Sequence, residues 1–78
     1  MTTSYTASDL REQQVTALQM HEAALAAQRE HLVASNAATD PVQKYIADAL
    51  EQIQGCHARH FKRIADAYAL AAHEVETR

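Results

Sequence analysis

Three histidines and one cysteine are the residues whose types and spacing could do chemistry in this chain. His57 and His60 are three residues apart, directly after Cys56, so on a helix they lie near one another. If the chain folds back on itself near residues 36–39, residues whose numbers sum to about 75 or 76 face each other, and His21 comes level with Cys56 and His57. Imidazole nitrogens and a thiolate suit zinc or copper. His21, His57, His60 and Cys56 are therefore candidates for a metal site, or for a group that responds to pH.

A simpler interpretation explains the same residues. No carboxylate stands in a Glu-x-x-His relation to any of these histidines, so the signature of a di-iron helical bundle is missing. His60 follows Cys56 by four residues and could act as its base, but no Gly-rich loop, oxyanion site or acidic partner accompanies them. Histidines at the rim of a helix interface and an unreactive thiol require fewer assumptions. We therefore predict a protein with no catalytic residues, no cofactor and no enzymatic activity.

A short basic patch lies beside Phe61. Arg59, Lys62 and Arg63 share one face of a helix, and Asp66 follows at the spacing of intrahelical ion pairs. The net charge of the chain is −3 with histidines neutral, and it becomes +2 when all five histidines are protonated. An acidic chain is not a general binder of polyanions. We expect a solvated face or a contact for an acidic protein here, and no nucleic-acid binding.

A single proline divides the helical pattern that must position these groups. Asp40 can cap a helix, Pro41 fits its first turn, and Gln43 has the spacing that closes a capping box. The residue before a proline disfavours helix, so the upstream helix ends by about Thr39. The chain is predicted to be an all-α antiparallel two-helix hairpin. Its single domain, 1–78, comprises a flexible terminus over 1–8, a helix over 9–35, a turn over 36–40 and a helix over 41–76.

We expect the first helix to pack through a leucine heptad. Ser8 or Asp9 can cap this helix, and Asp9 with Glu12 has the spacing of a capping box. Leucines recur at intervals of seven, flanked by alanines that let a second helix approach closely. Polar residues alternate with the leucines and are expected at a partly exposed rim. The leucines are Leu18, Leu25 and Leu32, and the alternating polar residues are Gln14, His21 and Gln28.

The second helix has more apolar surface than the first helix can cover. Its apolar residues keep a spacing of three and four over roughly eight turns. Cys56 is the only cysteine, so no internal disulfide can stabilise so small a chain. We expect dimerisation or a protein partner to complete the hairpin to a four-helix bundle. The predicted partner-binding residues are Tyr45, Ile53, Phe61, Ile64, Tyr68 and Leu70.

These features predict a non-enzymatic protein-interaction module that offers an apolar helical face to a partner. A small chaperone, an adaptor and an inhibitor all fit this description. One alternative is a metal- or pH-responsive bundle that uses His21, His57 and His60, and another is a phage-encoded inhibitor of a larger host protein. The apolar runs are far shorter than the roughly 18 residues of a membrane span, and the first five residues lack the features of a signal peptide. A cytoplasmic protein without membrane contact is therefore expected.

The layout also resembles the small helical-hairpin co-chaperones of type III secretion needle subunits. The resemblance covers about residues 9–70 and consists of a capped first helix, the connection Asp40-Pro41-x-Gln43, a nearby Tyr45 and a longer apolar second helix. Tyr45 falls one place later than in that pattern, and residues 57–63 are more polar than the family's second helix. The resemblance implies a cytoplasmic chaperone whose helices pack against a helical-repeat protein.

Overall fold

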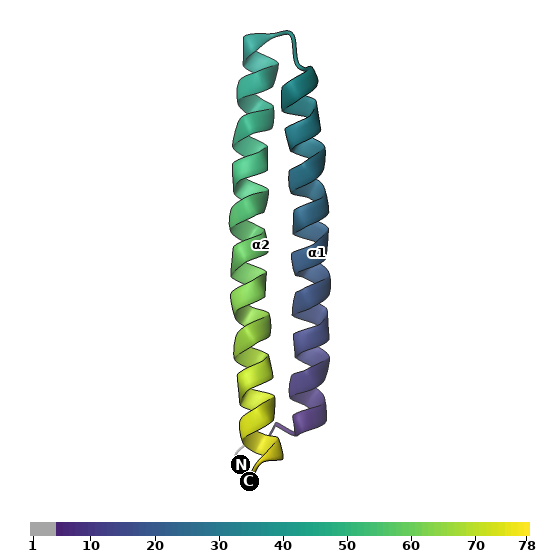
Figure 1. Ribbon diagram of the computed structural model, residues 1–78, viewed down its shortest axis with the longest axis vertical. Coiled ribbons are helices and arrows are strands. Elements are labelled where there is room, and N and C mark those ends of the chain that lie inside the picture. The colour runs from purple at the N-terminus through teal and green to yellow at the C-terminus, as the bar shows by residue number, and fades with distance from the viewer. Residues whose placement is uncertain (1–4) are drawn as a thin grey trace.

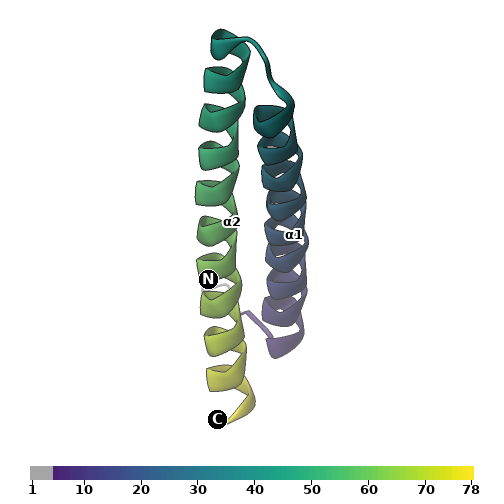
Figure 2. The same cartoon turned by 45° about the horizontal axis from the view of Figure 1, so that its top comes forward.

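The protein is an antiparallel pair of long helices. The computed structural model describes residues 5–78, and within them the chain forms two helices, α1 (Ala7–Ala37) and α2 (Pro41–Glu76). They lie side by side, with the connection at one end and the first turn of α1 and the last turn of α2 at the other (Figures 1 and 2). The molecule measures 57 × 21 × 13 Å, so its shortest dimension is about that of one helix. The predicted all-α pair of packed helices is confirmed.

Helix α1 begins earlier than predicted because Thr6 caps it. The Thr6 hydroxyl accepts a hydrogen bond from the Asp9 amide at 3.1 Å, and the Asp9 carboxylate accepts one from the Thr6 amide at 3.3 Å. This capping box replaces the predicted one between Asp9 and Glu12, and Ser8 lies inside the helix. The predicted range 9–35 is two residues short at each end. Of the flexible terminus predicted over 1–8, residues 1–4 lie outside the described part of the chain.

Asp40 caps α2, which occupies the same range, 41–76, that the pattern predicts. The Asp40 carboxylate accepts a hydrogen bond from the Val42 amide at 2.9 Å, and Pro41 is the first helical residue. Gln43 makes no hydrogen bond to Asp40 among the described residues, so the cap satisfies one amide and forms no box. A three-residue connection over 38–40 suffices because α1 ends on an extended Ala38.

Small residues form the buried centre of the contact between the two helices, and the leucine heptad borders it. The leucines lie beside the contact: Leu18 and Leu25 are half-buried, and Leu32 is 48% exposed. Alanine and glycine let the two helix backbones approach closely, and Leu18 and Leu25 pack at the edge of that close approach. We call the buried contact the inner seam; its residues are Leu10, Ala17, Ala24 and Ser35 from α1 and Ala47, Gly55, Ala58, Ala65 and Ala72 from α2.

Polar side chains of α1 cross the inner seam to α2. His21 Nδ1 donates to the Ala58 carbonyl at 2.7 Å, and Gln28 Nε2 donates to Glu51 Oε1 at 2.9 Å. Ser35 is buried and donates its hydroxyl hydrogen bond to Asp48. His21 and Gln28, like Gln14, are half-buried, as predicted for a partly exposed rim, and His21 and Gln28 also bond to α2. Hydrogen bonds of this kind compensate the desolvation of the polar groups.

The register of the hairpin differs from the predicted one by about one turn of helix. The numbers of His21 and Ala58 sum to 79, as do those of Gln28 and Glu51, against the predicted 75 or 76. Two causes account for the difference. The connection comprises residues 38–40 and is centred on Thr39, later than the middle of the predicted 36–39, and this alone gives a sum of 78. In addition, each side chain leans toward the N-terminus of its own helix. Two side chains that meet therefore come from residues with slightly higher numbers than the residues whose backbones lie directly opposite.

Candidate functional site

Large apolar side chains cover the outside of the hairpin. Because the inner seam consists of small and polar residues along most of its length, many of the bulkier residues are exposed, while others such as Leu18, Phe61 and Ile64 are half-buried. None of the large side chains of the described residues is fully buried. The exposed ones on the two helices are Val15, Met20, Leu32, Val33, Val42, Tyr45, Ile46, Leu50, Ile53 and Leu70.

Part of this apolar surface forms one continuous face over both helices. A shallow groove at mid-length is lined by Met20 and Ala23 of α1 and by His57 and Phe61 of α2. A second shallow groove, nearer the connection, is lined by residues of both helices that include Ala34 and Leu50. Residues seven or eleven apart on a helix share one side, so Ala34 continues the side of Ala23, and Leu50 continues that of His57.

We call this surface the uncharged face. Its α1 half is a row of mainly small residues, and its α2 half is a row of large ones at spacings of three and four. It carries no Asp, Glu, Lys or Arg. Its polar atoms come from two histidines and one tyrosine, and the amides of Gln43 and Gln54 line its two grooves beside them. Its residues are Met20, Ala23, Ala27, His31, Ala34 and Ala38 from α1 and Ile46, Leu50, Ile53, His57, Phe61, Ile64 and Tyr68 from α2.

The predicted partner-binding residues divide between two sides of α2. Ile53, Phe61, Ile64 and Tyr68 belong to the uncharged face. Tyr45 is 75% exposed and Leu70 is 63% exposed, but at about 100° per residue both lie roughly a third of a turn away from this face.

Sequence reasoning missed the α1 half of the uncharged face. Its alanines, from Ala23 to Ala38, follow the same three-and-four spacing as an apolar row, about a third of a turn from the inner seam. That second periodicity is the signal that could have identified the row. The periodicity is easily overlooked, because the high helix propensity of alanine already explains a row of alanines without any contact surface.

The candidate metal ligands do not come together. His21 uses one ring nitrogen on the Ala58 carbonyl and lines a groove on the opposite side of the hairpin from His57. Cys56 is exposed, and its Sγ lies 3.2 Å from Arg59 Nη2. The His60 ring is tilted against Phe61, with 5.8 Å between centroids. Between residues 5 and 78, no three His, Cys, Asp or Glu side chains gather in a cluster that could hold a metal ion.

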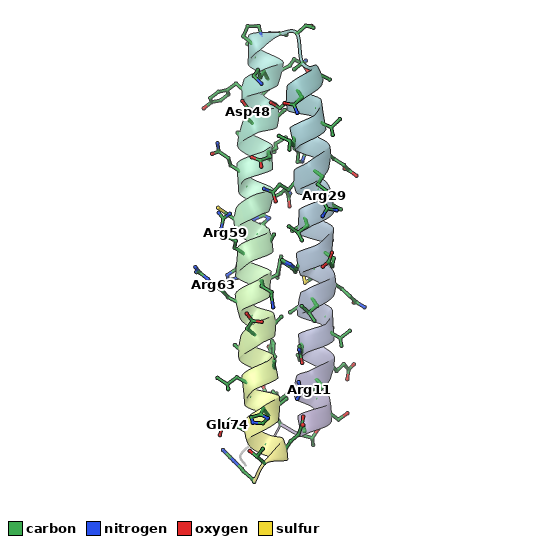
Figure 3. The ribbon with its side chains drawn as sticks, viewed as in Figure 1. Arg11, Arg29, Asp48, Arg59, Arg63 and Glu74 are labelled. Atoms are coloured by element: carbon green, nitrogen blue, oxygen red, sulfur yellow. The ribbon has the colours of Figure 1, made fainter. Side chains whose placement is uncertain are left out.

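The basic patch lies away from the uncharged face. Lys62 Nζ is 2.7 Å from Asp66 Oδ1, which confirms the predicted intrahelical ion pair. Arg59 and Arg63 extend from the outer edge of α2 in the view of Figure 3. With His21, Leu25 and Gln28 they line a shallow groove between the helices. This second side therefore combines cations with apolar surface and differs chemically from the uncharged face.

One ion pair joins the helices at their open end. Arg11 Nε is 2.9 Å from Glu76 Oε1, and both side chains are partly exposed. The hydrogen bond from Arg11 is the main reason that the pKa of Glu76 lies below its ordinary value of 4.5. The pair connects the first turns of α1 to the last turn of α2 and so limits fraying of both ends.

Comparison of the chain with protein-family models, with curated proteins and with solved structures finds no match. Neither helix, over the residues that the structure describes, combines the length and apolar character that crossing a membrane requires.

Proposed function

We propose that this protein is a non-enzymatic interaction module that binds the helices of a protein partner through its uncharged face. The observation that carries the proposal is the placement of large apolar side chains on the outside of a hairpin whose buried contact consists mainly of alanine, glycine and polar residues. Ile46, Leu50 and Ile53 are 51%, 37% and 47% exposed in the isolated hairpin. Leaving such surface in water costs roughly 25 cal/mol per Å².

The shape and chemistry of the face favour a helical partner. The face is long, shallow and formed by two parallel rows, which suits the ridges of another helix or helix pair. Without a carboxylate, ammonium or guanidinium group, it offers no means of selecting a charged ligand. Its grooves are open and lack a cluster of catalytic side chains, so the proposal needs no substrate. A chaperone, an adaptor and an inhibitor would all act through this same contact.

Photo-crosslinking in cells that produce the protein tests this function. A photoreactive phenylalanine analogue placed at Phe61 lies at the centre of the uncharged face, and the same analogue at Val33 is the matched control, 67% exposed on another side of α1. We expect one discrete protein adduct from position 61 and none at the same yield from position 33. Equal yields from both positions, or no adduct from position 61, would contradict the proposed function.

A further inference from the structure

We infer that the partner on the uncharged face is a second copy of this chain, in a two-fold four-helix bundle with both connections at the same end. This inference rests on the proposed function, because it names the occupant of the same face. It depends on three observations about the hairpin: its area, the angle between its two contact rows, and the sizes of the residues in the two halves of the face.

The accessible surface is too large for a compact chain of this mass. A folded monomer of 8.6 kDa has about 4,700 Å² of accessible surface, whereas this chain has 5905 Å². The excess is about 1,200 Å² per chain. If two copies cover that excess with each other, they bury about 2,400 Å² in total, which lies within the range of obligate homodimers. A single helix from another protein would offer less surface than a second hairpin to cover this excess.

Each helix carries two contact rows about a third of a turn apart. In α2 the inner seam runs through Ala58 and Ala65, and the outer row runs through His57 and Ile64. Consecutive residues are separated by about 100°, so the two rows face two neighbouring helices at nearly a right angle. This is the arrangement of a helix in a square four-helix bundle. The hairpin uses one row of each helix and leaves the other row free.

The two halves of the uncharged face complement each other in size. A two-fold axis parallel to the helices places α2 of each copy over α1 of the other at the same height. Leu50 then lies over the region of Ala34, and His57 over the region of Ala23. Large side chains meet small ones on both sides of the axis, as an isologous contact requires. Every neighbouring helix pair in this bundle is antiparallel, and no like charges meet because the face has none.

Sedimentation equilibrium of the full chain is the first test. We expect twice the chain mass, 8.6 kDa, for the unaltered protein at micromolar concentration. Leu50→Glu buries a charge in the proposed contact and should raise the dimer dissociation constant about 100-fold or more. Leu70→Glu makes the same charge change on the same helix outside the face and should leave the constant within about threefold. A monomeric unaltered chain, or equal effects of the two substitutions, would overturn the inference.

A distance measurement tests the arrangement and does not depend on whether Leu50→Glu folds. Thr39→Cys in a Cys56→Ser background places one spin label at each connection. Connections at the same end should give a distance on the order of 20 Å, set by the helix spacing in a bundle. Connections at opposite ends would be separated by nearly the 57 Å length of the hairpin, and that result would overturn the proposed arrangement.

The two proposals can fail separately. Suppose that the adduct at position 61 contains a different protein and that the purified chain is monomeric. These results would overturn the inference that the partner is a second copy and would support the uncharged face as the interaction surface. An adduct with the mass of two chains supports both proposals. Absence of any adduct at position 61 would contradict both.

Discussion

Ser35 shows at residue scale how polar side chains contribute to the contact between the helices. It is buried, donates to Asp48, and its hydroxyl oxygen accepts from Lys44 Nζ at 3.1 Å. One hydroxyl thus satisfies an acidic and a basic side chain of α2 near the connection. Serine is also small enough for the close approach of the helices. A larger apolar residue at this position would fill the seam but leave Asp48 without its hydrogen-bond donor.

Replacing Ser35 by alanine should destabilise the hairpin by about 1 kcal/mol, because a buried hydrogen bond is lost and Asp48 keeps an unmet acceptor. Urea unfolding at one fixed protein concentration measures the change, since self-association would make stability depend on concentration. Ser8→Ala is the control, because Ser8 is exposed on the first turn of α1 and should change stability by less than about 0.5 kcal/mol. Equal effects of the two substitutions would contradict the role of Ser35.

Glu76 makes the stability of the open end depend on pH. Its pKa is lowered in the folded protein by the hydrogen bond from Arg11, so the carboxylate stabilises the fold above its ordinary pKa of 4.5. That contribution disappears as the pH falls through the lowered value. Glu76→Gln should therefore lower the melting temperature at pH 7 and have no effect once Glu76 is protonated.

Melting curves from pH 7 to pH 3 check this expectation. Glu74→Gln is the matched control, since Glu74 lies two residues away and makes no ion pair among the described residues. High salt should shrink the difference between Glu76→Gln and the unaltered protein at neutral pH, because the pair is exposed. A difference that stays the same from pH 7 to pH 3 would contradict the ion-pair explanation.

At the scale of the helices, apolar periodicity predicts the elements well and the contact between them poorly. Asp40 and Pro41 locate the connection because their backbone preferences are local. The choice between Leu18 and Ala17 as the contact depends on how closely two backbones approach, which no local pattern contains. Pattern reasoning assigns the larger residue to the core. Here the alanine heptads permit a closer approach, and the leucines remain beside the contact.

Gly55 tests how tightly the inner seam is packed. A Cβ atom at this position would lie 2.9 Å from Gln28 Nε2, which is bonded to Glu51. Gly55→Ala gains about 1 kcal/mol of helix propensity but displaces Gln28 from that bond, so we expect almost no net change in stability. Against a Gln28→Ala background, the same substitution should stabilise by about 1 kcal/mol. Urea unfolding of the four proteins measures this coupling, and strictly additive effects would contradict it.

At the scale of the whole molecule, the sequence predicts a hairpin whose apolar surface exceeds what its own two helices can cover. The prediction of excess surface needs only the chain length and the apolar count of α2. The location of that surface could not be predicted, because it depends on which side of each helix the inner seam occupies. The same limit applies to the metal candidates: His21 and His57 come level in a simple register, but they lie on opposite sides of the hairpin.

Hydroxyl-radical footprinting of the protein in its native assembly measures whether a partner covers the uncharged face. One tyrosine of the chain reports on this face, and another serves as the control. Tyr68 lies on the uncharged face, and Tyr45 lies off this face and is 75% exposed. We expect Tyr45 to be oxidised several-fold faster than Tyr68 in the assembly. We also expect the oxidation rate of Tyr68 to rise when Leu50→Glu disrupts the contact. Oxidation of Tyr68 at a rate that Leu50→Glu does not change, or protection of Tyr45 instead, would contradict the uncharged face as the site of partner contact.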